Sequence, residues 1–275
     1  MKKFPLVRLK QFVTNPPFFI FWCKRFFSYK QSSFQYKEKI KTIKQLNAKE
    51  TLDYITENNV SLIRFGDGEF GMLFGAGIYP PDSDWSQRYT RKLKETLERE
   101  LVLKNEKILI SIPPIRQVVY REGDSPKQEV ISNMHTEARL ALGNLSHYDL
   151  VYGDWSVFLP HLNPDLDWTP LKNFLENKKV VIVTGGIEKM QEISLGQKTY
   201  FVECGKHNAF SRRDKIFTKL DNLITDESLK TNQTLFMVSL GCTAGVVVEH
   251  LSAKGFTAFD TGHIFRFAME KIKQL

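Results

Sequence analysis

Two carboxylates separated by one glycine are the residues of this chain best suited to bind a metal ion. Asp67 and Glu69 lie in the segment Arg64–Glu69, which reads RFGDGE. In an extended segment alternate side chains share one face and lie roughly 6.5 Å apart along the chain, so both carboxylates are expected to reach one region. Two such anions suit a hard cation such as Mg²⁺ or Mn²⁺. The alternative is a plain surface turn, because Asp-Gly is a common turn dipeptide.

The chemistry expected of that ion is Lewis-acid stabilisation of a diphosphate leaving group. Arg64 stands just before the loop, where a guanidinium could hold a phosphate through two parallel hydrogen bonds. It could equally be a structural ion-pair partner of Asp67 or Glu69, and the sequence leaves both possibilities open.

Two other glycine-containing turns could bind phosphate. They are Thr184-Gly185-Gly186 and Gly241-Cys242-Thr243-Ala244, and each follows an apolar run. Amides at a helix N-terminus favour anions, which makes Gly185, Gly241 and Thr243 candidate ligand contacts. No lysine follows the glycines as in a Walker A loop. The alternative is a tight turn in which Thr243 caps the next helix.

His263 follows Asp260-Thr261-Gly262 at the end of another apolar run. It could bind the metal, contact a phosphate, or cap the last helix.

The elements that would position these residues form an alternating pattern. Strands are expected at residues 60–65, 107–112, 149–152, 179–183, 199–204, 235–240 and 257–260, and helices at 38–58, 86–101, 130–142, 211–220, 244–254 and 264–272. Apolar strands that alternate with helices predict an α/β fold, with a mostly parallel sheet and helices on both faces. The candidate segments all follow expected strands, and ligands of such sheets bind at the carboxyl ends of the strands.

A basic, aromatic arm over residues 1–37 is expected to lie apart from a domain over residues 38–275. The arm has no Asp or Glu and carries the whole net charge of +8 on Lys2, Lys3, Arg8, Lys10, Lys24, Arg25, Lys30 and Lys37. The rest of the chain is balanced, whereas a nucleic-acid-binding domain spreads basic residues over its folded surface. We therefore expect no nucleic-acid partner.

The arm also contains Phe18, Phe19, Phe21 and Trp22, in an apolar run too short to span a bilayer. Aromatic and basic residues together suit the surface of an anionic membrane. The alternative is that they pack on the domain or on a partner. Three scattered cysteines argue against a disulfide framework and favour the cytoplasm. The expected location is therefore cytoplasmic, with peripheral contact at the inner face of the cell membrane.

Several of these segments occur in one order that resembles a known family. They are Arg64–Glu69, Glu203-Cys204 with Asn208–Phe210, Leu240-Gly241 with Thr243-Ala244, and Asp260 with Gly262-His263. The chain resembles the GT-D type glycosyltransferases, first described as domain of unknown function DUF1792, from about residue 50 to its end. The resemblance implies a Rossmann-like fold and a metal-dependent Asp-x-Glu motif.

The same resemblance implies sugar transfer from a nucleotide-sugar, a UDP-hexose, to a glycan, glycoprotein or lipid-linked acceptor in bacterial surface glycan assembly. Asp67, Glu69 and Arg64 would be catalytic, Asp67 and Glu69 would bind Mn²⁺ or Mg²⁺, and the donor would contact Arg64, Gly66, Gly185, Gly241, Thr243 and His263. Gly205, Cys242 and Phe265 depart from the residues expected for the family.

The alternatives are a metal-dependent phosphohydrolase and a non-catalytic nucleotide-sugar-binding module. A general base could be Asp154, Asp165 or Glu188, and the sequence does not select among them.

Overall fold

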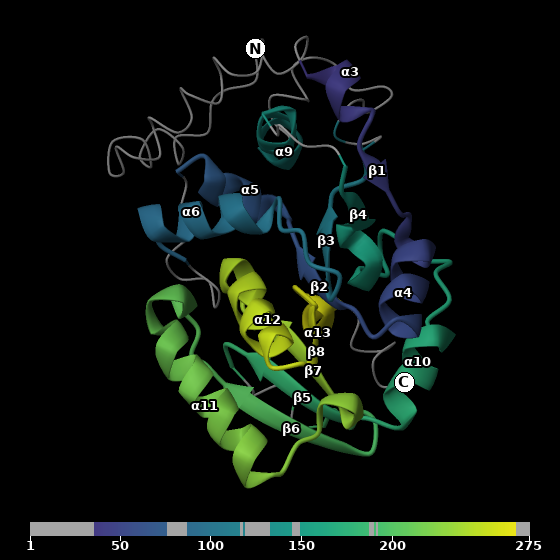
Figure 1. Cartoon of the computed structure of the whole chain (residues 1–275), viewed down its shortest axis with the longest axis vertical. Coiled ribbons are helices and arrows are strands. Elements are labelled where there is room, and N and C mark those ends of the chain that lie inside the picture. The colour runs from purple at the N-terminus through teal and green to yellow at the C-terminus, as the bar shows by residue number, and fades with distance from the viewer. Residues whose placement is uncertain are drawn as a thin grey trace, which may run out of the picture.

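A parallel sheet runs through the centre of the protein (Figure 1). The computed structural model describes residues 36–75, 87–115, 118, 133–144, 149–186, 190 and 192–267. Seven strands are hydrogen-bonded in the order β1-β4-β3-β2-β8-β7-β5, and every pair is parallel. Their bounds are β1 Lys44–Gln45, β2 Ser61–Arg64, β3 Ile108–Ile112, β4 Val151–Asp154, β5 Lys179–Thr184, β7 Thr234–Ser239 and β8 Thr257–Asp260. The predicted fold class is confirmed.

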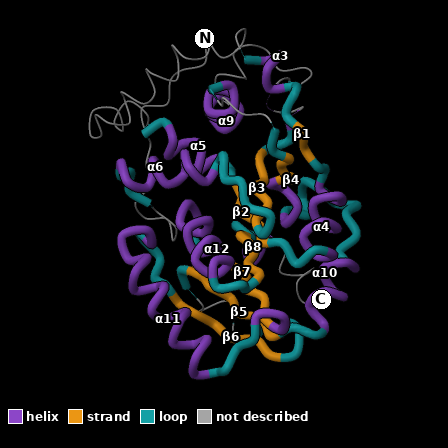
Figure 2. Tube along the Cα trace, in the orientation of Figure 1, coloured by secondary structure: helices purple, strands orange, loops and turns teal. Residues whose placement is uncertain are grey.

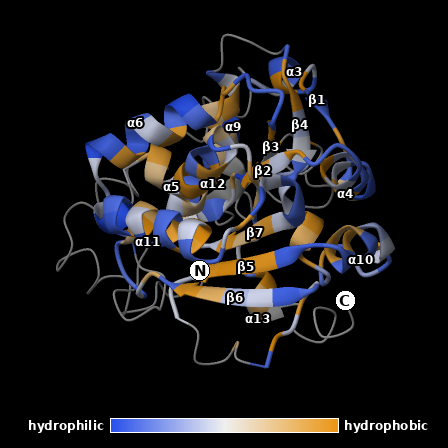
Figure 3. Ribbon diagram, turned by 60° about the horizontal axis from the view of Figure 1, so that its bottom comes forward, coloured by the Kyte–Doolittle hydropathy of each residue, from blue (hydrophilic) through white to orange (hydrophobic). Residues whose placement is uncertain are grey.

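An eighth strand, β6 (Lys198–Glu203), lies alongside β5 (Figures 2 and 3). Just past its end, the backbone N–H of Cys204 donates to the carbonyl of Thr184 at 2.8 Å. Most residues of β5 and β7 are hydrophobic, whereas β6 is more mixed (Figure 3). The mixed character of β6 fits a place beside β5, away from the centre of the sheet.

The strands are buried on both faces because helices cover both. Val181 and Val183 of β5 join one apolar core, and Val180 and Ile182 join the other. The first core also takes residues from α3 Lys37–Ile40, α5 Asp67–Leu73, α6 Arg91–Glu100, α9 Asn133–Gly143, α11 Arg213–Asp226 and α12 Ala244–Ala253. The second takes residues from α4 Ala48–Glu57, the 3₁₀ helix η1 Trp155–Phe158, α10 Thr169–Glu176 and α13 Ile264–Phe267.

Neighbouring strands β2 and β8 send the chain to opposite faces of the sheet. β2 leads into α5 on the first core, and β8 leads into α13 on the second. We call the carboxyl ends of these two strands, with residues 65–66 and 261–263 that follow them, the switch point. Ligands of open α/β sheets bind where connections diverge in this way.

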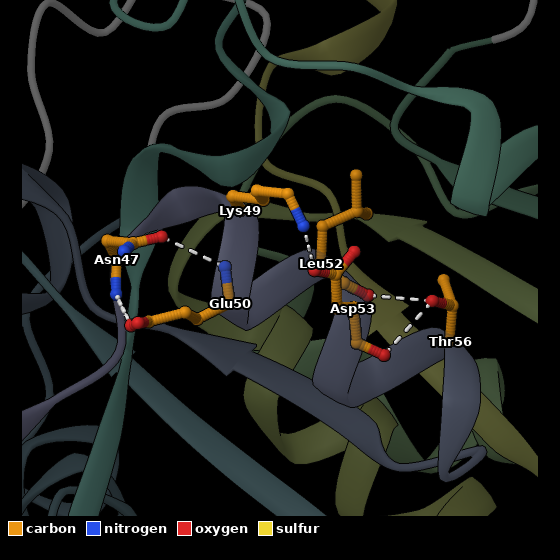
Figure 4. Close-up of polar contacts among 6 residues, drawn as sticks. All are labelled: Asn47, Lys49, Glu50, Leu52, Asp53 and Thr56. Atoms are coloured by element: carbon orange, nitrogen blue, oxygen red, sulfur yellow. Dashed lines mark hydrogen bonds and ion pairs between the residues drawn. The ribbon is translucent and has the colours of Figure 1, made fainter.

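The predicted strands are confirmed, with boundaries that move by up to two residues. The predicted helix over 38–58 is wrong in its middle, where β1 interrupts it. Asn47 starts α4 there: its side chain accepts from the N–H of Glu50 at 2.9 Å, and Glu50 accepts from the N–H of Asn47 at 2.8 Å (Figure 4). This reciprocal capping box fixes the start of the helix. Helix α10 was not predicted.

The predicted arm lies outside the described residues, apart from Tyr36 and Lys37. The part of the predicted last helix beyond Phe267 also lies outside them. Over the described part of the chain, no helix is both long enough and apolar enough to cross a membrane.

One carboxyl group is buried between α6 and α12 without a hydrogen-bond partner in the described part of the structure. It belongs to Glu100, the last residue of α6, which is 0% exposed. A Cβ at Gly245, in the first turn of α12, would stand only 2.6 Å from Glu100 Oε2. Burial, followed by the nearby Glu249 carboxylate, raises the pKa of Glu100 well above its ordinary value, while Arg99 opposes the shift.

We predict that Glu100→Gln stabilises the protein more at pH 8 than at pH 5. The folded chain binds this proton more tightly than the unfolded chain, so the free energy of unfolding falls as pH rises from about 4.3 toward the raised pKa. Removing the ionisable group should recover on the order of 1–3 kcal/mol at pH 8. Thermal unfolding of both proteins at the two pH values measures the difference.

Glu98→Gln is the matched control, because Glu98 is exposed on the same helix and its ion pair with Lys94 is a surface one. It should shift the melting temperature little at either pH. Equal shifts for Glu100→Gln at pH 5 and pH 8 would contradict the assignment.

Candidate functional site

The predicted metal-binding carboxylates begin a helix. Asp67 is the first residue of α5 and Gly66 is its N-cap. The expectation of an extended Asp67–Glu69 segment is therefore wrong, because residues two apart in a helix project about 200° apart around its axis. The helix forms because Glu69 folds back, and its Oε2 accepts a hydrogen bond from the N–H of Gly66 at 2.8 Å. Acidic residues in the first turn also suit the positive end of the helix.

Both residues nevertheless lie in the first turn of α5, directly after the switch point, and Glu69 is bonded to Gly66 within it. Asp67 is exposed and Glu69 is partly buried. Burial raises the pKa of Glu69, and the nearby Asp67 carboxylate adds to this effect. The hydrogen bond from Gly66 and the thiol of Cys242 act in the opposite direction. The helix thus brings the two acids close enough to repel each other.

No group of three or more His, Cys, Asp or Glu side chains within the described ranges could hold a metal ion. A pair of carboxylates still fits one kind of site. Mg²⁺ commonly binds through one or two carboxylates and fills its other positions with water and substrate phosphates. Asp67 and Glu69 match that donor set, and Gly66 takes only the Oε2 oxygen of Glu69.

Arg64 is held by backbone and aromatic contacts, and its side chain forms no ion pair with another described residue. It is 6% exposed, its Nε donates to the carbonyl of Trp155 at 2.6 Å, and its guanidinium carbon lies 5.5 Å from the centroid of the Trp155 ring. No described residue bonds to its two terminal nitrogens. Of the two roles left open by the sequence, the ion pair with Asp67 or Glu69 is not formed.

Asp260 joins the two strands of the switch point. Its Oδ2 accepts from the backbone N–H of Arg64 at 3.2 Å, and its Oδ1 accepts from the N–H of Gly262 at 3.0 Å. It is 4% exposed, and burial raises its pKa to about 7, against the attraction of Arg64 and with added repulsion from Glu69. The sequence analysis placed Asp260 in a candidate segment at a strand end, but it did not assign a role to the carboxylate.

The other residues predicted to contact the donor lie at different distances along the sheet edge from β2. Gly66 lies within the switch point, where an added Cβ would stand 3.4 Å from Glu69 Oε2. Exposed His263 lies in the turn after β8, at the same edge of the sheet. Gly241 follows β7, the next strand along, and has a positive φ of 53°. Gly185 follows β5, which is separated from β2 by β8 and β7.

Thr243 is fully buried, and its hydroxyl has no hydrogen-bond partner in the described structure. Thr243 is the N-cap residue of α12, as the turn alternative expected, but its side chain makes no capping hydrogen bond. The N–H of Thr243 is already bonded to the carbonyl of Leu240. Gly241 of the same turn faces open space, because a Cβ built on it would meet no atom within 4 Å.

Asp154 is a candidate base that the structure links to the site, because Arg64 acts on its carboxylate and contacts the neighbouring Trp155. It ends β4, and its Oδ1 accepts from both the N–H and the hydroxyl of Ser156. Burial raises its pKa above the ordinary value, against the hydrogen bonds from Ser156 and the attraction of Arg64. Asp165 is exposed in a turn, and Glu188 lies outside the described residues. Trp155, beside Asp154, was not singled out in the sequence.

The strand order and the switch point describe an open α/β fold, and comparison with known proteins gives its family. A family model described as glycosyltransferase GT-D fold matches residues 62–267. The chain therefore belongs to the GT-D fold family of glycosyltransferases.

Two curated streptococcal relatives share part of their sequence with this chain. Probable glycosyl transferase Gly of Streptococcus gordonii is 26% identical over 236 residues, which cover 81% of this chain and 32% of the relative. Glycosyltransferase GlyD of Streptococcus pneumoniae serotype 4 is 26% identical over 239 residues, which cover 78% of this chain and 26% of the relative. The chain spans about a third or less of the length of these relatives.

Solved structures share the fold. A structure of domain of unknown function 1792 superposes with a TM-score of 0.68 at 24% identity, covering 88% of this chain and 87% of the other. Another, described as a distinct glycosyltransferase fold, gives 0.65 at 24% identity, with coverage of 90% and 87%. A glycosyltransferase of the same domain class from Streptococcus sanguinis gives 0.64 at 22% identity, with coverage of 84% and 85%.

We predict that Glu69 and Asp67 differ in their effect on stability. Glu69→Ala removes the acceptor for the N–H of Gly66 and should lower the free energy of unfolding by about 0.5–2 kcal/mol. Glu69→Gln keeps an acceptor oxygen and should stay within about 0.5 kcal/mol of the parent protein, as should exposed Asp67→Ala. Urea denaturation at pH 7 measures all three. An alanine variant at position 69 as stable as the glutamine variant would show that this hydrogen bond does not stabilise α5.

Proposed function

We propose that this chain transfers a sugar from a nucleotide-activated donor, a UDP-hexose, with Asp67 and Glu69 holding Mn²⁺ or Mg²⁺ on the donor diphosphate. The strongest support is that two carboxylates, those of Asp67 and Glu69, lie at one edge of the sheet with the guanidinium of Arg64. The terminal nitrogens of that guanidinium make no hydrogen bond to a described residue. The two carboxylates attract a cation, and the guanidinium attracts a phosphate. A metal–diphosphate complex satisfies both.

When bound, the ion would supply Lewis-acid stabilisation of the departing diphosphate. Arg64 would hold a phosphate oxygen pair through Nη1 and Nη2, in the two-bond geometry that guanidinium groups prefer. Because its Nε is already fixed on Trp155, little conformational freedom would be lost on binding. A Cβ on Gly66 would make ordinary contacts with Glu69 Oε2 at 3.4 Å and the Trp155 ring at 3.6 Å, so the proposed role of Gly66 is to begin α5 beside the donor.

The other donor contacts extend along the carboxyl edge of the sheet. His263 follows β8, which pairs with β2, and Gly241 follows β7, which pairs with β8. Both could therefore flank the donor. Gly185 lies one strand further along, and Thr243 would act through its position in the turn, because its side chain is buried. His263 is the one titratable side chain among these contacts.

Membership of a glycosyltransferase family favours transfer over two other activities that the same carboxylates could support. A metal-dependent phosphohydrolase would cleave the donor equally well with or without an acceptor. A non-catalytic nucleotide-sugar-binding module would bind the donor and release no nucleotide with any acceptor.

The metal requirement is tested by measuring release of UDP from UDP-hexoses with a panel of glycan acceptors. We expect no release in EDTA, and recovery on adding Mn²⁺ or Mg²⁺. Asp67→Asn should reduce the rate by 100-fold or more without unfolding the protein, since Asp67 is exposed and makes no described capping contact. Glu98→Gln, on the exposed face of α6, is the control that should keep full activity. Full activity in EDTA would contradict the proposal.

The acceptor is proposed to be a glycan, glycoprotein or lipid-linked sugar in bacterial surface glycan assembly, which the arm over residues 1–37 would help to reach. Its eight basic residues and its aromatic run suit an anionic membrane surface.

Sedimentation with vesicles containing anionic lipid tests the arm, comparing the full chain with a chain that begins at Glu38. The full chain should bind, the shortened chain should not, and binding should weaken in high salt, because exposed charges are screened. Equal binding by both chains would contradict a membrane role for the arm.

A further inference from the structure

Gly262 leaves the space that the Arg64 guanidinium occupies. A Cβ built on Gly262 would overlap Arg64 Nη1 and would stand 2.9 Å from the central guanidinium carbon. Gly262 also has a positive φ of 52°, a conformation that L side chains rarely adopt. The clash is the more specific of these two constraints, because it concerns a residue of the proposed donor site.

Three contacts from two distant parts of the chain, Trp155 and Asp260, fix the same arginine. The carbonyl of Trp155 accepts from Nε, and the Trp155 ring lies beside the guanidinium. The carboxylate of Asp260 accepts from the backbone N–H groups of both Arg64 and Gly262, which ties the two residues together. The guanidinium therefore lies between the end of β4 and the turn after β8.

These contacts use only one hydrogen-bond donor of the Arg64 guanidinium. Nε is bonded to the protein, whereas Nη1 and Nη2 have no partner among the described residues. Arg64 is nevertheless 94% buried, since its exposed fraction is 6%. A buried arginine whose head group is fixed at one nitrogen is ready to bind an anion with the other two.

We infer that Gly262 is a positioning residue for the donor diphosphate, which it serves by leaving room for the Arg64 guanidinium. The inference rests on the proposed function, in which Arg64 binds that diphosphate. A side chain at position 262 would displace Nη1 of Arg64. The two terminal nitrogens of the guanidinium would then no longer point at the phosphate of a bound donor. The effect should fall on donor affinity and should disappear when Arg64 itself is absent.

Gly255 provides a matched control at the other end of the same strand. It lies in the turn before β8 and also has a positive φ, of 85°. The nearest atom to an added Cβ there is Thr231 Cγ2, at an ordinary 3.5 Å. Gly255→Ala therefore carries the same kind of backbone strain as Gly262→Ala without displacing a cation.

Calorimetric titration of UDP in the presence of Mn²⁺ tests the inference, using the full chain and the variants Gly262→Ala, Gly255→Ala, Arg64→Ala and Arg64→Ala/Gly262→Ala. We expect Gly262→Ala to raise Kd at least 10-fold and Gly255→Ala to change it less than twofold. In the Arg64→Ala background, the further change at position 262 should alter Kd less than twofold. Equal effects of the two glycine variants, or the same loss at position 262 with and without Arg64, would overturn the inference.

Melting temperatures of the same proteins keep the test informative if Gly262→Ala folds poorly. Because the overlap is with Arg64, removing that side chain should restore most of the lost melting temperature in the double variant. A double variant whose loss is the sum of the two single losses would overturn the inference. Failure of the proposed function would give another result. The parent protein would then bind no UDP, but removing Arg64 would still restore the melting temperature lost in Gly262→Ala.

Discussion

The arrangement of the site depends on how β2 and β8 separate. The two strands pair in parallel at Leu62 and Phe259, and beyond this point their chains turn to opposite faces of the sheet. Strands that diverge leave backbone N–H groups without a ladder partner, and a buried unpaired N–H is costly. The carboxylate of Asp260 accepts from the N–H groups of Arg64 and Gly262 and so satisfies one donor from each side. This contact holds the carboxyl ends of β2 and β8 together. The first turn of α5, which carries Asp67 and Glu69, therefore starts next to the turn that follows β8.

Holding acids so close together has an energetic cost that the fold must offset elsewhere. Burial raises the pKa values of Glu69, Glu100 and Asp260, and the structure sets a single guanidinium, Arg64, against the last of these. Desolvation of each carboxylate disfavours its charged form. The two apolar cores on either side of the sheet supply the opposing stabilisation. On the proposed function, a bound divalent cation would lower the pKa of Glu69 and stabilise the folded chain according to its occupancy.

The apolar runs were sufficient to predict the sheet, because strands covered on both faces read as continuous hydrophobic segments. They also predicted that Arg64, Asp67 and His263 lie at the carboxyl ends of strands, where the structure has them. The conformation of Asp67 and Glu69 was predicted wrongly, since Gly68 and Gly71 disfavour a helix and the sequence reads as a loop. Burial of Phe70, Met72 and Leu73, together with the Glu69–Gly66 contact, outweighs that preference.

The contacts that surround Arg64 could not be read from local sequence. Trp155 lies 91 positions away from it and Asp260 lies 196 positions away, so only the strand order brings the three residues together. The burial of Thr243 has the same origin, because the turn after β7 packs against α5. Sequence patterns predict which strand a residue follows, whereas its neighbours depend on which strands lie side by side.

A crystal structure of the full chain with UDP and Mn²⁺ would test the central claim most directly, since anomalous scattering identifies the metal. The account predicts a manganese peak shared by the Asp67 and Glu69 carboxylates and the diphosphate, with Arg64 Nη1 or Nη2 on a phosphate oxygen and Nε still on the Trp155 carbonyl. A nucleotide bound away from the carboxyl ends of β2 and β8, or a manganese ion that contacts neither carboxylate, would contradict it.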